Sequence, residues 1–214
     1  EMKALRKEFW MEIRKSKSRF ISILLIVALG VAFFSGIQAS SPDMRYSGDA
    51  YYEAAMLMDL KIQGTLGLTE RDVKAVSDID GVELAEGGYS TDVMSGEDDA
   101  RKVLHLESIS SNFNLLTADE GRIPKKSGEI FLDKPFAKNR GYKIGDTISV
   151  SEDGDSELLK KTTYTVVGIG SSPLYISFNR GNTTLGSGEI SGFGYILPED
   201  FDQEAFTQIY IMVH

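Results

Sequence analysis

The sequence predicts an α+β domain that follows one N-terminal transmembrane helix. Three observations lead to this fold class. A run of 23 residues without a charged side chain extends from Phe20 to Pro42. The residues after Pro42 mix helical periodicity with short alternating patterns, in no regular βα order. The composition, 42% hydrophobic and 10% aromatic, is that of a packed domain and not of a disordered tail.

We divide the chain into four parts on this basis. Residues 1–19 form an interfacial amphipathic helix, 20–41 a transmembrane helix, 42–58 a stalk, and 59–214 an α+β domain outside the cytoplasm. The 172 residues after Pro42 have room for one good-sized domain. The chain has no cysteine, so the domain contains neither a disulfide nor a thiolate metal site.

The apolar run fits a membrane-spanning helix in length. At 1.5 Å per residue it spans roughly 34 Å, enough for a hydrocarbon core of about 30 Å. A core helix of a globular protein would have a polar face, and this run has none. We expect the membrane-facing side chains to include Phe20, Leu25, Leu29, Phe33 and Ile37.

A cleaved signal peptide is the alternative for the same run. Residues 37–39, Ile-Gln-Ala, resemble a small-residue cleavage site. However, the run exceeds the usual 7–15 apolar residues, and Glu1, Glu8 and Glu12 lie in the long segment before it. These features favour a retained anchor.

Charge predicts the orientation of the helix. Residues 1–19 contain seven Lys or Arg and three Glu, a net charge of +4, whereas the whole chain carries −9. The other residues therefore carry −13, and the positive flank places the N-terminus in the cytoplasm. A domain this acidic also excludes nucleic acid as a partner.

The first 19 residues have the pattern of an interfacial helix. Leu5, Phe9 and Ile13 recur every four residues, Trp10 lies beside them, and bases cover the other face. Such a helix places its Trp at headgroup depth and its bases toward anionic lipid. A frayed basic leader is the alternative.

The stalk and the first part of the domain have recognisable signals. Tyr51, Ala55 and Met58 have helical spacing, and we expect bends at Pro42 and Gly48. A strand at residues 60–62 follows, and then a helix over LTERDVKAVSDIDGV. In that helix Thr69 is the N-cap, Asp72 its capping-box partner, and Leu68 packs on Val73.

The remaining elements alternate between strands and short helical turns. We expect strands at 82–94, 102–109, 129–132, 147–150, at TTYTVVGIG, at FGYIL and at TQIYIMV. A short helix ends near Arg140 with Gly141 after it, and Pro198 opens a helical turn. Residues 168–194 contain seven glycines and are predicted to be a long loop or irregular ribbon.

Catalytic, cofactor and metal sites are not indicated. The glycine-rich residues 181–188 lack the Lys of a phosphate-binding loop, and the acidic run from Glu152 lacks the later ligands of a calcium loop. His105 and His214, the two histidines, do not have metal-ligand spacing, and His105 in VLHLE fits a strand residue. We predict that the chain is not an enzyme and binds no cofactor.

The glycine-rich segment at 170–194 is a candidate contact loop, with a passive connection as the alternative. Four aromatic side chains in or beside it would serve as the anchors that interfaces favour. They are Tyr175, Phe178, Phe193 and Tyr195.

The order of several motifs resembles a known family. After the apolar run come LTERDVKAVSDIDGV, GRIPKKSGEIFLDKPFAKNRGYKIGDTISV, TYTVVGI and GYILPEDF. This order resembles the FtsX-like, MacB-like permeases of ABC transporters, and SSPLYISFNRGNTTLGSGEISGFGYILPEDF is more similar to their long Gram-positive members. Such permeases have at least four transmembrane helices, so we expect this sequence to be an N-terminal part with an incomplete domain.

The resemblance implies a function and partners. It implies a MacB-like periplasmic core domain on a permease in the bacterial plasma membrane, which transmits ATP-driven movement to the outside. The implied partners are a separate ABC ATPase subunit, a second permease copy or a paired permease, and membrane lipid. The alternatives are an anchored sensor or adhesion domain without a transport role, and an anchored enzyme with an acidic cleft.

Overall fold

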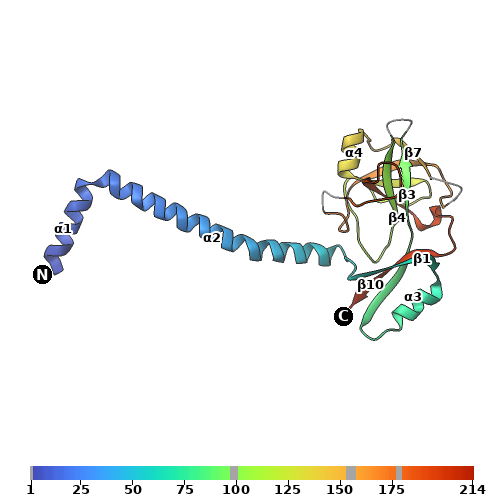
Figure 1. Cartoon of the computed structure of the whole chain (residues 1–214), viewed down its shortest axis with the longest axis horizontal. Coiled ribbons are helices and arrows are strands. Elements are labelled where there is room, and N and C mark those ends of the chain that lie inside the picture. The colour runs from blue at the N-terminus through green and yellow to red at the C-terminus, as the bar shows by residue number, and fades with distance from the viewer. Residues whose placement is uncertain (1, 97–100, 153–157, 177–179) are drawn as a thin grey trace. The chain divides into compact units, whose positions relative to one another are not determined.

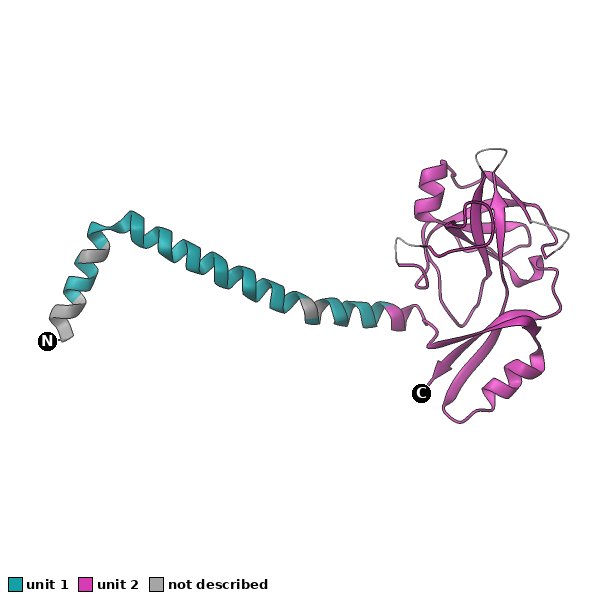
Figure 2. Ribbon diagram, viewed as in Figure 1, with its two compact units in different colours: residues 1–51 teal, residues 52–214 magenta. Residues whose placement is uncertain are grey.

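The computed structural model describes residues 2–96, 101–152, 158–176 and 180–214, without the side chains of residues 2–6, 12, 13, 41 and 43 (Figure 1). The chain forms two compact units, residues 1–51 and 52–214, which Figure 2 shows in different colours.

Unit 1 is helical. Helix α1 covers Met2–Lys15 and ends with two bases, Arg14 and Lys15. Helix α2 covers Lys17–Ala54, so its last residues already belong to unit 2. It runs unbroken through Pro42 and Gly48, and neither residue marks an end of the helix. The predicted boundary between membrane helix and stalk therefore coincides with no interruption of the secondary structure.

Unit 2 contains a three-stranded antiparallel sheet in the order β1-β10-β2. Its strands are β1 (Leu60–Leu68), β2 (Val82–Gly88) and β10 (Phe206–Val213). Helix α3 (Glu70–Ser77) joins β1 to β2 and lies beside this sheet (Figure 1). The predicted N-terminus of α3 is confirmed, because Asp72 accepts a hydrogen bond from the Thr69 backbone N–H at 2.7 Å.

The second sheet has seven strands in the order β5-β8-β6-β9-β4-β3-β7. They are β3 (Ser90–Ser95), β4 (Lys102–Ser108), β5 (Thr117–Gly121), β6 (Glu129–Asp133), β7 (Thr147–Ser151), β8 (Thr163–Ser171) and β9 (Ile190–Ile196). Because β7 also pairs with β8, all of these strands except β5 close into a barrel. Two pairs, β4–β9 and β6–β8, are parallel. The sheet is thus mixed, with parallel and antiparallel pairs.

The main hydrophobic core fills the barrel. Its inward side chains come from every barrel strand and include Val93, Leu104, Leu106, Ile130, Leu132, Ile148, Val166 and Ile196, each 0% exposed. Phe136 of α4 (Lys134–Arg140) packs into the same cluster. The predicted end of α4 is confirmed, since Gly141 takes the left-handed conformation with φ 77°. The predicted Pro198-led turn is the 3₁₀ helix η2 (Pro198–Asp200).

Three predictions about strands were wrong. The single strand expected at 82–94 is two strands, β2 and β3, which belong to different sheets. At the change of sheet a Cβ on Gly87 would lie 2.5 Å from the ring of Phe206, so only glycine fits there. Strand β5 was not predicted, and within 168–194 only the part between β8 and β9 is a connection.

Candidate functional site

The apolar part of α2 lacks protein cover. Among the described residues α2 is the one helix long and apolar enough to cross a membrane. The predicted membrane-facing side chains are all exposed, Leu29 to 74% and Phe33 to 73%. An apolar surface of this extent requires an apolar solvent or a partner to cover it.

The residues that follow α2 belong to unit 2 and are bonded to its other segments by backbone hydrogen bonds. The carbonyl of Ala55 accepts from the N–H of Leu115 at 2.8 Å, and the carbonyl of Met56 accepts from the N–H of Asn114 at 2.9 Å. The Asn114 side-chain oxygen also accepts from the N–H of Met58 at 3.2 Å. We call residues 55–59 with Asn114 and Leu115 the junction.

The junction continues directly into the three-stranded sheet. Asp59 donates its backbone N–H to the carbonyl of Ile211 at 2.9 Å, and its carboxylate accepts from the N–H of Val213 at 2.9 Å. Ala55 is buried, and both it and Met56 bond to the loop after β4. The residues between the end of α2 and β1 are therefore held by hydrogen bonds within unit 2.

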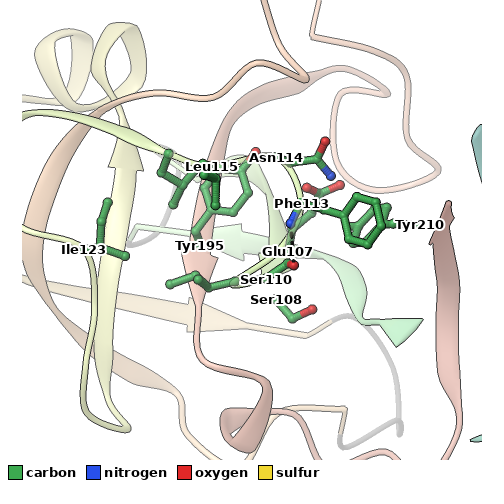
Figure 3. A pocket seen from close by; sticks show the side chains of 11 residues that line it. Glu107, Ser108, Ser110, Phe113, Asn114, Leu115, Ile123, Tyr195 and Tyr210 are labelled. Carbon is green, nitrogen blue, oxygen red and sulfur yellow. Dashed lines mark hydrogen bonds between the residues drawn. The ribbon is translucent and has the colours of Figure 1, made fainter. Parts of the chain in front are cut away.

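A cavity of about 280 Å³ lies behind the junction (Figure 3). It is bordered by the loop after β4, by β9 and by β10. The lining residues are Glu107, Ser108, Ile109, Ser110, Phe113, Asn114, Leu115, Leu116, Ile123, Tyr195 and Tyr210. Asn114 belongs both to the junction and to the cavity wall, so the two features share a side chain.

An ion network on the outer face of the barrel leads into this cavity. His105 faces Asp92 across the β3–β4 pair, and its Nδ1 lies 2.5 Å from Asp92 Oδ1. Its Nε2 lies 3.5 Å from Glu107 Oε1, two residues further along the same face of β4. The Tyr175 hydroxyl donates to the same Glu107 oxygen at 2.7 Å.

The network keeps its members charged. Burial alone would lower the pKa of His105, but hydrogen bonds to Asp92 and Glu107 raise that pKa to about 9. Burial opposes ionisation of Glu107, yet the bond to the His105 imidazolium and its charge outweigh it and lower the Glu107 pKa. At neutral pH an imidazolium thus lies between two carboxylates.

The connection between β8 and β9 covers the network. Thr183 donates its hydroxyl to Asp92 Oδ2 at 2.6 Å. The Tyr175 ring stacks on Phe193 with an interplanar angle of 8°. Arg180 lies over the same Phe193 ring, 5.4 Å from its centroid, and pairs with Asp133 at 3.2 Å. Aromatic and polar contacts together therefore hold this cover in place.

The predicted contact residues do not form an exposed surface. Phe193 and Tyr195 are 1% and 3% exposed on β9, in a small core with Phe131. Tyr175 is partly buried against them, and Phe178 lies outside the described residues. Burial of Phe193 and Tyr195 is a correction to the expectation that they serve as anchors, because neither can reach a partner in this conformation.

Sequence reasoning missed the network, although one signal was present. In VLHLE the alternation of Leu104 and Leu106 with His105 and Glu107 indicates that the two polar residues share a face. Treating His105 as a strand residue was right, but its partners Asp92 and Tyr175 come from other segments. Among the described residues no group of three or more His, Asp or Glu could hold a metal ion.

These features define a class of protein: an apolar membrane-type helix followed in the chain by an α+β domain. The chain belongs to the MacB-like periplasmic core domain family, whose model matches residues 20–214. It is therefore the periplasmic-domain region of an ABC transporter permease-type protein, with one candidate transmembrane helix. No curated protein matches the chain in sequence.

Several solved structures are similar at low sequence identity. The extracellular domain of the noncanonic ABC-type transporter YknZ from Gram-positive bacteria is 12% identical, with 71% of this chain and 75% of that one covered and a TM-score of 0.46. The periplasmic region of MacB from Actinobacillus actinomycetemcomitans is 13% identical, with 71% and 66% covered and a TM-score of 0.42. A domain of a putative permease from Porphyromonas gingivalis is 12% identical, with 69% of each chain covered and a TM-score of 0.43.

Proposed function

We propose that this chain is a permease subunit that couples ATP hydrolysis by a separate ABC ATPase subunit to a conformational change outside the cytoplasm. The observation that carries the proposal is the junction. A coupling element must pass displacement on, and a flexible linker would absorb it as conformational freedom. Here the residues after α2 are held by hydrogen bonds to both the loop after β4 and strand β10.

The route of the displacement follows from these bonds. A shift along α2 pulls on Ala55 and Met56, whose carbonyls are bonded to Leu115 and Asn114. Asp59 bonds to Ile211 and Val213 of β10, so the same shift also acts on the three-stranded sheet. Because packed cores switch between discrete arrangements and do not deform continuously, such a shift would reposition the two sheets.

The proposal includes a topology and partners. The net charge of +4 in residues 1–19 and −13 after Arg19 supports a topology with the N-terminus in the cytoplasm and unit 2 outside the bacterial plasma membrane. The exposed apolar face of α2 contacts lipid and a second permease, either a copy of this chain or a paired one. Substrate export or extraction is the work that this movement performs.

Insertion of a flexible segment tests the coupling. A Gly-Ser run of about seven residues, close to two helical turns, is placed after Gly48, inside α2. The matched control is an alanine-rich helical run of the same length at the same place, which preserves stiffness and helical phase. The full permease and its ATPase are reconstituted, and ATP hydrolysis and transport are measured together.

The expected result is uncoupling by the flexible insert alone. ATP hydrolysis should persist with both inserts, whereas transport per ATP should fall sharply with the Gly-Ser run and remain near the parent value with the helical run. Equal transport per ATP in both would contradict the proposal, and α2 would then be a tether of a sensor or adhesion domain. Protease treatment of intact cells tests the topology, since unit 2 should be digested and an N-terminal tag protected.

A further inference from the structure

The cavity behind the junction contains two buried polar atoms without a partner. Among the described residues, Glu107 Oε2 and Asn114 Nδ2 have no hydrogen-bond partner, although Glu107 is 1% and Asn114 7% exposed. An unpaired buried polar atom destabilises the folded state, and more strongly when it is charged. Figure 3 shows both side chains among those that line the cavity.

The other polar groups of the lining already have partners. Ser108 accepts from the N–H of Tyr89, and Ser110 accepts from the N–H groups of Asn112 and Phe113. The Tyr195 hydroxyl donates to Ser172, and the Tyr210 hydroxyl accepts from Gln208. Among the described side-chain atoms of the lining, one carboxylate oxygen and one amide nitrogen thus have no partner at all, and the hydroxyl groups each make at least one hydrogen bond.

The charge of the surroundings favours a cation. Two carboxylates, Asp92 and Glu107, face one imidazolium, His105, and so leave one negative charge uncompensated within the network. Lys61 also acts on Glu107, but its side chain is exposed. A bare metal ion would need several more oxygen ligands than one carboxylate oxygen and an amide supply. The charge of an organic ammonium, by contrast, is balanced by a single carboxylate.

The walls and the volume limit its size. Phe113, Leu116 and Ile123 give the lining an apolar side. A volume of about 280 Å³ lies at the small end of the ~300–1,000 Å³ typical of ligand pockets. The occupant must therefore be small and partly apolar.

We propose that this cavity binds a small amphipathic cation. Its primary ammonium donates to Glu107 Oε2, a neighbouring oxygen accepts from Asn114 Nδ2, and its apolar group packs on Phe113 and Ile123. Because Asn114 also holds Met56 and Met58, the occupant lies against the residue that fixes the junction. Binding itself does not depend on the chain's role in transport, so the two proposals fail separately.

Two matched probes test the site on the full chain in nanodiscs of zwitterionic lipid. Phenylalaninol has the ammonium, the oxygen and the apolar ring, and N-acetylphenylalaninol keeps the oxygen and the ring but replaces the ammonium by a neutral, bulkier amide. Hydrogen exchange is followed by segment, because local protection separates binding in the cavity from partition of the probe into lipid. Phenylalaninol should protect the segment 107–116, and its acetylated twin should need at least about tenfold higher concentration.

Variants then locate the binding. Glu107→Gln should weaken phenylalaninol binding about 10–100-fold, since a hydrogen bond to a charged group is lost. Glu120→Gln, an exposed residue of β5, is the matched control and should change nothing. Ile123→Trp narrows the cavity while leaving the carboxylate and its partners in place, and should weaken both probes.

The proposal is overturned by any of three results. The first is equal binding of the charged and acetylated probes to the parent chain. This comparison uses no variant, so it does not depend on whether a variant folds. The second is unchanged binding in Ile123→Trp, which would place the probe elsewhere. The third is no protection of 107–116 by millimolar phenylalaninol, which would mean that water alone satisfies Glu107 and Asn114.

Discussion

The two faces of the barrel wall are both buried, but they are buried by different means. On β4 the inward side chains Leu104 and Leu106 are 0% exposed, and their neighbours are apolar residues of the other barrel strands. The outward side chain Glu107 is 1% exposed, yet it is an ionised carboxylate under a connection that returns from β8 to β9. The same strand therefore serves two environments.

The difference shows how each face is stabilised. Apolar contact is non-directional, so the inward face tolerates changes that preserve volume. Buried charges must find opposite charges and hydrogen bonds at defined positions. On the outward face those positions come from register, because Asp92 is opposite His105 on the neighbouring strand. The inward face is thus insensitive to pH, whereas the outward face responds to it.

Truncation in the inward face should have the largest effect. Leu106→Ala leaves a cavity in the barrel and should destabilise unit 2 by about 2–5 kcal/mol. The matched control is Leu66→Ala, because Leu66 is 98% exposed. Chemical unfolding of the full chain in a mild detergent, at two pH values, measures both. A loss that changes with pH would contradict the proposed independence of the inward face from charge.

Removal of the His105 imidazolium should cause the second largest loss of stability. His105→Gln leaves Asp92 and Glu107 without their shared cation. The free energy of unfolding of unit 2 should fall by roughly 2–3 kcal/mol near pH 6. Breaking a fully buried ion pair costs about 3–5 kcal/mol, and the expected loss is smaller here because His105 is partly exposed. The pKa of His105 in the folded chain, about 9, lies above the ordinary histidine value of 6.5. The stabilisation is therefore complete below pH 6.5 and is lost as the pH rises through 9. A parent–variant difference that stays constant from pH 6 to 9.5 would contradict the network.

The third largest loss of stability is expected where the backbones of β8 and β5 lie close together. A Cβ on Gly170 of β8 would lie 2.0 Å from the Thr117 carbonyl oxygen of β5. Gly170→Ala should therefore push β5 from the edge of the barrel and destabilise by about 1–3 kcal/mol. Gly48→Ala is the control, since a Cβ there has nothing within 4 Å. Hydrogen exchange should increase in 117–121 first, and uniform exchange throughout unit 2 would contradict a local cause.

The sequence was most informative where a structure depends on neighbouring residues. The start of α3 depends on Thr69 and Asp72, three residues apart, and the end of α4 depends on Gly141. The apolar run of α2 needs no partner to be recognised. The prediction succeeded at these places because their stabilising interactions lie within one turn of helix.

Prediction failed where distant segments decide. The strand pattern of 82–94 is continuous, and only the rings of Phe206 and Tyr210 on β10 explain why the chain changes sheets at Gly87 and Gly88. The parallel β4–β9 pairing that buries Phe193 and Tyr195 joins residues 88 positions apart, such as His105 and Phe193. An aromatic residue in a glycine-rich segment was therefore taken for a surface anchor, when glycines marked close packing.

The smallest effect is expected outside the barrel, at the N-terminus of α3, and it should have the opposite pH dependence from His105. The Asp72 carboxylate accepts from both the backbone N–H and the hydroxyl of Thr69, each at 2.7 Å. Thr69→Ala removes the hydroxyl but leaves the backbone bond, so the melting temperature should fall by only about 2–4 °C. The same bonds, the backbone bond first, lower the pKa of Asp72 from 3.8. Their contribution is thus present above pH 3.8 and is lost as the pH falls through the lower folded pKa.

A double-mutant cycle distinguishes this capping interaction from a general surface effect. Asp72→Asn should remove most of the sensitivity to Thr69→Ala, because the two side chains act as one interaction. The barrel should lose the stability that depends on the His105 charge as the pH rises. The N-terminus of α3 should lose the stability that depends on the Asp72 charge as the pH falls. Additive effects of Thr69→Ala and Asp72→Asn would show that the helix begins without this bond. The cycle is measured by the melting temperatures of the four chains at neutral pH and below pH 3.8. If the effect of Thr69→Ala does not change with pH, it comes from the helix propensity of residue 69 and not from the Asp72 carboxylate.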